Sequence, residues 1–210
     1  MIEYYPTGRF YLLPTPKGAF RALLHPHHNL AEHFVINLLR ERITPLSQPE
    51  TITALLDDCD RKTAMKIMYE AQSAGWIQGF REAQHMPDLP VSRALSNLLS
   101  TLSSSGQALL TDLSGFQLAS AGLDAEHSQR LATLAAELAV IHNRHADYLS
   151  QSMLIDEPGW AMIDPLGSSK IGIWVLNPGK HRFALLINDM PNLNRREFVT
   201  LSWILVNRYG

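Results

Sequence analysis

Cysteine is nearly absent from this sequence, which holds a single residue of that type, Cys59, among 210. One cysteine cannot form an internal disulfide, so the fold must depend on a packed core. The neighbouring residues Asp57, Asp58 and Asp60 are acidic, and nearby negative charge raises the pKa of a thiol and lowers its reactivity. We therefore interpret Cys59 as a bystander without redox function.

Long apolar runs and net charge are also missing. No stretch approaches the roughly 20 apolar residues that cross a bilayer, and the start from Met1 to Tyr5 lacks the basic and apolar regions of a signal peptide. These features predict a cytoplasmic protein that has no membrane as a partner. Eighteen basic and 20 acidic residues give a net charge of -2, so no global field attracts polyanions, and nucleic acid binding is not favoured.

Motifs of known catalytic chemistry are absent as well: the sequence has no nucleophile elbow, Walker-type phosphate loop, dinucleotide fingerprint or zinc-protease helix. Histidines near residue 25 are interrupted by Pro26 and lack cysteines or carboxylates at the spacing of a zinc site. We predict no enzyme activity, no catalytic residue, no cofactor and no metal. Three clusters are interpreted as surface loops: Gly167–Lys170, the carboxylates Asp156, Glu157 and Asp164, and the histidines His25, His27, His28 and His33.

What is present suits a folded protein of two domains. Hydrophobic residues make up 46% and charged residues 18% of the chain, which is a globular composition, and domains cluster at about 100 to 150 residues. Two prolines, Pro87 and Pro90, disfavour helix in the segment from Gln84 to Pro90. The sequence therefore predicts one domain over residues 1–86 and another over 87–210.

The first predicted domain begins with a hairpin and continues as helices. Residues 9–13 and 19–24 are predicted as strands around the turn at Pro14–Gly18. Apolar spacing then predicts three helices, one carrying Phe34 and Leu38, one from about Glu50, and one that stops at Gly75, followed by a short strand over residues 76–80.

This order resembles a winged-helix domain over about residues 28–82. In DNA-binding members the third helix enters the major groove. The candidate DNA contacts on that helix here are Arg61, Lys62 and Lys66, which the nearby acidic residues offset. We favour a protein-contact or dimer-supporting role for this domain and keep DNA binding as the alternative.

The second predicted domain alternates helices and strands. The predicted order is a helix over 91–102, a hairpin of 107–112 and 116–120 with Gly115 in the turn, a long helix from about Ala125 to Ser150, strands at 153–163, 171–176 and 182–187, and a closing helix capped by Asn194.

The long helix carries two apolar stripes. The bulky stripe is predicted to cover the domain's own sheet and consists of Leu131, Leu134, Leu138, Ile141 and Tyr148. Small residues allow another helix to approach closely, although alanine is also simply the best helix former. A helix with two apolar faces requires that both be covered. The predicted dimer interface is therefore the second stripe, Ala132, Ala135, Ala136 and Ala139, with His142 at its rim, and a glutamate at Ala135 or Ala139 should split the dimer.

The segment from Gly106 to Gly122, with its "allvd-x-x-G-x-x-l-a-s" pattern, resembles the hairpin of the roadblock / dynein light chain family, and the element order over about residues 90–210 is similar. The resemblance implies an α+β fold with a five-stranded antiparallel sheet, homodimers in which sheets join and long helices pack side by side, and a role in scaffolding or regulating Ras-like small GTPases, without a catalytic side chain.

The resemblance leaves two other functions open. The chain could be a transcriptional regulator that reads DNA with its first domain and dimerises through its second. It could also sense a ligand between sheet and helix, although Trp160 and Trp174 are bulky enough to fill that space. We favour the hypothesis of a non-enzymatic adaptor over the transcriptional regulator and the ligand sensor.

Overall fold

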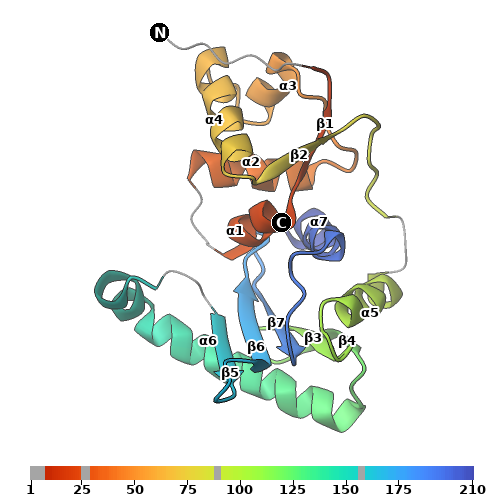
Figure 1. The fold of residues 1–210 in the computed structure, drawn as a ribbon, viewed down its shortest axis with the longest axis vertical. Coiled ribbons are helices and arrows are strands. Elements are labelled where there is room, and N and C mark those ends of the chain that lie inside the picture. Colours follow the sequence, from red (N-terminus) through yellow and green to blue (C-terminus); the bar gives the residue numbers. More distant parts are fainter. Residues whose placement is uncertain (1–7, 25–28, 88–90, 156–158) are drawn as a thin grey trace. The chain divides into compact units, whose positions relative to one another are not determined.

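The computed structural model of the chain describes residues 8–24, 29–87, 91–155 and 159–210, with the backbone alone at 91–93. Its contacts group the chain into two compact units, the first formed by Met1–Asp88 and Asn194–Gly210 and the second by Leu89–Leu193 (Figure 1). Predictions that concern Met1 to Tyr5, His25, His27, His28, Asp156, Glu157 and the end of the proline segment lie outside the described residues.

Unit 1 contains helices around a two-stranded antiparallel sheet. Strand β1 pairs with β2, and the register joins Tyr11 to Phe80 and Pro14 to Ile77. The elements of this unit are β1 (Tyr11–Pro14), α1 (Pro16–Leu24), α2 (Leu30–Arg40), α3 (Pro49–Ala54), α4 (Arg61–Ser73), β2 (Ile77–Phe80) and α7 (Arg196–Tyr209).

The predicted hairpin near the N-terminus is wrong in its second strand. Residues 16–24 form helix α1, because Pro16 suits the first helical position and the amide of Gly18 donates to the Thr15 hydroxyl at 3.1 Å. Ala19, Ala22 and Leu23 are buried along this helix. The partner of β1 comes instead from more than 60 residues further along the chain.

Helix α2 is fastened at its start by a capping box. The Asn29 side chain accepts from the amides of Ala31 and Glu32, and the Glu32 carboxylate accepts from the Asn29 amide. Glu32 is also buried and pairs with Arg21 of α1 at 2.7 Å. A buried carboxylate that has both partners ties α1 to α2 without an unsatisfied charge.

Gly18 is the position where α1 approaches the turn before β2. A Cβ atom at this residue would lie 2.0 Å from the carbonyl oxygen of Trp76. We expect Gly18→Ala to lower the free energy of unfolding by about 1–3 kcal/mol, as overpacking does, although alanine favours helix. Chemical denaturation measures the change. Lys62→Ala, at an exposed position of α4 in the same unit, is the control, and equal stability of the two variants would contradict the close approach.

Helices α2, α3 and α4 followed by β2 keep the predicted order of a winged helix. However, β2 pairs with β1, upstream of these helices, and the segment after β2 meets the chain before α3 through a single bridge between Ile43 and His85. The winged-helix resemblance therefore stays a prediction.

Helix α7 belongs to unit 1, which corrects the predicted second domain of 87–210. The Phe198 ring packs against Phe20 at 5.9 Å between centroids, and the Trp203 indole donates to the carbonyl oxygen of Glu41 at 2.7 Å. Its N-cap is Arg195, without a capping side chain, so the predicted Asn194 cap is wrong. Apolar residues occupy most of α7, and such a helix can pack on whichever apolar surface is available.

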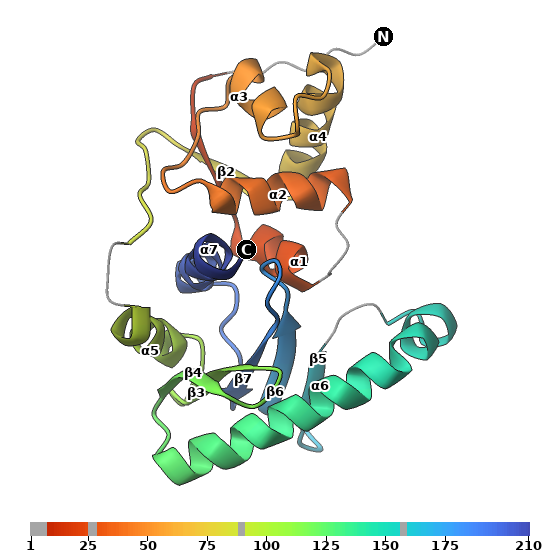
Figure 2. The same cartoon turned by 180° about the vertical axis from the view of Figure 1, so that it is seen from behind.

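Unit 2 is a five-stranded antiparallel sheet with strand order β4-β3-β7-β6-β5. In the views of Figures 1 and 2, the long helix α6 runs along the sheet. Its elements are α5 (Val91–Thr101), β3 (Ala108–Asp112), β4 (Gln117–Ala121), α6 (Ala125–Met153), β5 (Gly159–Ile163), β6 (Ser169–Leu176) and β7 (Phe183–Asn188).

The hairpin between β3 and β4 is confirmed. Gly115 has a φ of 86°, which favours glycine, and the Asp112 carboxylate accepts from the amides of Ser114 and Phe116. The first strand of the hairpin also pairs with β7, so that Leu109 lies opposite Leu186. The predicted strand at residue 153 is wrong in its first part, because Met153 ends helix α6.

Candidate protein interface on helix α6 and strand β5

Helix α6 extends over 29 residues and is fixed at both ends. At its start the Asp124 carboxylate accepts from the His127 amide at 2.8 Å and lies 2.7 Å from Nδ1 of the His127 ring. These two interactions hold the pKa of Asp124 below its usual value. At its end Leu154 adopts a left-handed conformation with a φ of 55°. The start and the end of this long helix are therefore both defined by local interactions.

The alanine face of α6 packs on the sheet of its own unit. Ala132 and Ala135 are fully buried and Ala139 is 2% exposed. They meet the large side chains of the sheet in one core cluster that contains Leu109, Ile173, Ala184 and Leu186. The predicted dimer interface of Ala132, Ala135, Ala136, Ala139 and His142 is therefore corrected: all but Ala136, which is half-buried, are buried within the subunit.

The bulky face of α6 points the other way. Leu134, Ile141 and Tyr148 are 37%, 40% and 60% exposed, and their spacing of seven residues aligns them along one side of the helix. Leu131 and Leu138, at the margin, pack partly against the core. The prediction that the whole bulky stripe covers the sheet is thus wrong for three of its five members. Close packing against the large side chains of the sheet favours small residues at the centre of the contact, with Leu131 and Leu138 at its margin.

Strand β5 lies at one end of the sheet and has β6 as its neighbour. Trp160, Met162 and Ile163 are 37%, 66% and 64% exposed. Proteins usually protect such an edge with charges, prolines or a covering element, because its free amides and carbonyls can pair with another chain. We call Leu134, Ile141, Tyr148, Trp160, Met162 and Ile163 the α6–β5 face.

His142 joins the two elements of this face. Its side chain is 8% exposed, and its ring meets the Trp160 ring edge-on, with 6.4 Å between centroids and an interplanar angle of 85°. Burial lowers the pKa of His142, and the positive charge of Arg182 lowers it further. The residue predicted at the rim of the interface therefore lies beneath it.

The candidate DNA contacts all lie on the exposed side of α4. Arg61, Lys62 and Lys66 face solvent, and the Lys66 ammonium lies 3.6 Å from the Glu70 carboxylate. Asp60 caps the same helix and accepts from the amide and hydroxyl of Thr63, which lowers the pKa of this carboxyl. DNA contact by these residues stays a prediction.

Of the other clusters predicted as surface loops, Asp164 and Gly167 lie in the connection between β5 and β6, whereas Ser169 and Lys170 begin strand β6. Asp164 accepts from the amides of Leu166 and Ser168 and lies 3.2 Å from the Lys170 ammonium, as expected for the predicted turn between β5 and β6. Nowhere in the described part of the chain do three or more histidines, cysteines or carboxylates gather as metal ligands do. His33 lies in helix α2 and not in the predicted loop, and its Nε2 atom is 3.4 Å from the side-chain amide nitrogen of Asn37.

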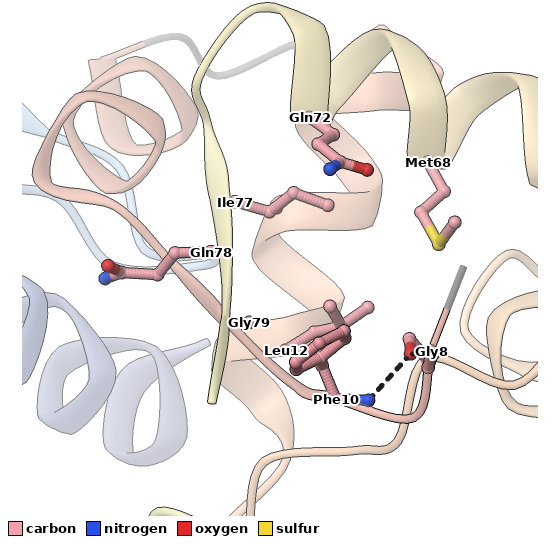
Figure 3. Close-up of a pocket in the computed structure, with 9 residues that line it drawn as sticks. Gly8, Phe10, Leu12, Met68, Gln72, Ile77, Gln78 and Gly79 are labelled. Atoms are coloured by element: carbon pink, nitrogen blue, oxygen red, sulfur yellow. Dashed lines mark hydrogen bonds between the residues drawn. The ribbon is translucent and has the colours of Figure 1, made fainter. Parts of the chain in front are cut away.

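Unit 1 contains a cavity of about 220 Å³ between β1, β2 and α4. Phe10, Leu12, Met68 and Ile77 provide its apolar wall, as Figure 3 shows. The Ser47 hydroxyl at its edge is engaged, since it accepts from the Phe10 amide and donates to the carbonyl oxygen of Gly8. None of the described residues that line the cavity carries a charge.

Membrane insertion through a helix has no structural support among the residues described. None of their helices combines the length and the apolar character needed to span a bilayer.

The strand order, the all-antiparallel pairing and the long helix against the sheet define unit 2 as a roadblock-like α+β module. The predicted α+β fold with a five-stranded antiparallel sheet is confirmed, with α7 assigned to unit 1. No protein-family model matches the sequence, and no curated protein matches it either.

The solved structures similar to this chain include one roadblock domain and two MglB structures. The Roadblock/LC7 domain from Streptomyces avermitilis is 15% identical, with 58% of this chain and 93% of that chain covered and a TM-score of 0.37. MglB with a tetrameric arrangement is 21% identical, with 55% and 86% covered and a TM-score of 0.38. MglB from Myxococcus xanthus is 16% identical, with 56% and 88% covered and a TM-score of 0.34.

Proposed function

We propose that this protein is a non-enzymatic adaptor that forms a homodimer through unit 2 and regulates a Ras-like small GTPase or a similar switch protein. The observation that carries the proposal is the α6–β5 face, where six large apolar side chains are exposed on a helix and an edge strand of one module. Exposed apolar surface is a mark of interaction sites, and both the helix and the edge strand offer it.

A second copy of the chain is the occupant that suits both parts of this face. An isologous contact presents the same surface twice, so an edge strand can pair with its copy and extend the sheet while the bulky sides of two α6 helices pack together. Seven-residue spacing of Leu134, Ile141 and Tyr148 is the arrangement that allows side-by-side helix packing. Dimerisation would thereby protect the β5 edge and cover the apolar side of α6.

The GTPase partner is supported by the roadblock-like fold, since regulation of small GTPases is what the family resemblance implies. The experiment is capture of GTPases from native lysate on the immobilised full chain, in parallel with a non-hydrolysable GTP analogue and with GDP. We expect a small GTPase that is retained at least several-fold more in one nucleotide state. Equal retention in both states, or no GTPase at all, would refute this part of the proposal.

A triple variant, Arg61→Gln, Lys62→Gln and Lys66→Gln, is the matched control for that capture. It changes exposed charges on α4 in unit 1 and should leave GTPase retention unchanged. The same variant tests the alternative of a transcriptional regulator: sequence selection from a random DNA pool favours the alternative only if enrichment is found with the original chain and lost with the variant.

A further inference from the structure

The contact between α6 and β5 contains a histidine ring that is enclosed but not fully hydrogen-bonded. The His142 side chain is 8% exposed, and its Nδ1 atom has no hydrogen-bond partner in the described part of the chain. On the β5 side the ring meets Trp160 edge-on. Buried polar atoms almost always have a partner, so an unpaired nitrogen at this junction calls for an explanation.

Arg182 is the charged group that faces His142 from the connection between β6 and β7. Its guanidinium is held in place, because Nε donates to the Asn177 amide oxygen at 2.9 Å and Nη2 donates to that of Asn143, next to His142 on α6, at 3.1 Å. These two hydrogen bonds keep the guanidinium next to the residue that follows His142 on α6.

Among the described residues, the remaining neighbours carry no negative charge that could compensate an imidazolium. Strand β5 carries no charged side chain, and one turn along α6 from His142 stand Leu138, Ala139, Ala146 and the exposed His145. No carboxylate of the described residues contributes to the titration of the ring. An imidazolium would therefore be buried between apolar groups and a like charge.

The direction of the pH effect follows from these surroundings. We call the state in which the His142 ring meets Trp160 the closed state, and the state in which the ring is solvated the opened state. In the closed state, burial and then Arg182 lower the pKa of His142, whereas a solvated histidine titrates near pH 6.5. The opened state binds the proton more tightly, so the closed state loses stability as the pH falls below about 6.5 and continues to lose it until the lowered pKa is reached. Above about pH 6.5 the ring is neutral in both states and the contact is fully stable.

We infer that His142 is an acid-sensitive latch: protonation of its ring releases Trp160 and β5 from α6 and thereby weakens self-association through the α6–β5 face. The second part rests on the proposed homodimer, whereas the first concerns a contact within one subunit. Each unit by which the closed-state pKa lies below the ordinary value shifts the equilibrium between the closed and opened states by up to about tenfold.

The experiment is an NMR titration of the full chain between pH 8 and pH 5 that follows the His142 ring and the Trp160 indole, with sedimentation velocity at each pH. We expect both signals to move together with a midpoint below 6.5, and the dimer dissociation constant to rise over the same range. His142→Gln, which cannot titrate, should abolish both changes. His127→Gln, an exposed histidine of the same helix, should retain them, and His145→Gln separates the contribution of the exposed neighbour.

A second variant keeps the test decisive if His142→Gln does not fold. Arg182→Gln removes the charge but keeps hydrogen-bonding capacity, and the His142 midpoint should then move upward, towards 6.5. A midpoint at or above 6.5 in the original chain, or a Trp160 response that persists in His142→Gln, would overturn the latch. A chain that is monomeric at every pH would refute the proposed homodimer instead, while the Trp160 titration would still decide the latch.

Discussion

Replacement of Ile141 by glutamate should convert the proposed homodimer into a monomer that remains folded. Ile141 is 40% exposed at the centre of the bulky side of α6, so a charge there is solvated in the single subunit. In the dimer the same carboxylate would be buried against apolar side chains of the second copy. Residues at the centre of an interface contribute about 2 kcal/mol or more, so we expect the dissociation constant to rise at least about 30-fold, as measured by sedimentation velocity.

The control for this variant is Gln129→Glu, which adds the same charge to an exposed position of the same helix, on a different side from Ile141. It should dimerise like the original chain, and both variants should show unchanged circular dichroism. A dimer that survives Ile141→Glu would show that α6 does not contribute to self-association through this side.

Replacement of Ala135 by glutamate should unfold unit 2 instead of splitting a dimer. Ala135 is fully buried in the cluster formed with Leu109 and Leu186. Every described member of that cluster is apolar, so a carboxylate there would have no ion-pair partner among them. An unpaired buried charge costs about 3–5 kcal/mol, a large share of the roughly 5–15 kcal/mol that stabilises a typical domain. Chemical denaturation followed by circular dichroism should therefore show an early transition or its complete loss.

Thr133→Glu is the matched control, because Thr133 lies two residues away on the exposed side of α6. This variant should unfold at a midpoint close to that of the original chain. If Ala135→Glu stayed folded and became monomeric, the alanine face would be an interface between subunits and the packing of α6 described above would be incorrect. The pair of glutamate variants at 135 and 141 thus distinguishes the two faces directly.

Local signals in the sequence were sufficient for most individual elements. Asp112 and Gly115 define the turn of the β3–β4 hairpin because one supplies a side-chain acceptor for two amides and the other adopts a positive φ. The helix over 61–73 follows from the Asp60 cap and its apolar spacing. These features act over a few residues, so they can be predicted without knowledge of the rest of the chain.

Local signals of this kind could not predict which distant segments pair with each other. Residues 19–24 have an apolar pattern short enough for a strand, yet they form a helix, and β1 pairs with a strand more than 60 residues away. Helix α7 was predicted from its apolar spacing, but the surface on which it packs lies in unit 1. The partner of β1 and the packing surface of α7 do not depend on local preference, because each is a contact with a segment far away in the sequence.

The amino-acid sequence alone determined that α6 has two apolar edges, one small and one bulky, and that the elements of residues 90–193 follow the roadblock order. Only the tertiary structure decided which edge packs on the sheet. The sheet surface is built from large side chains such as Leu109, Ile173 and Leu186, and close packing pairs large residues with small ones. The alanines therefore pack within the subunit, and the bulky residues are left exposed for a partner.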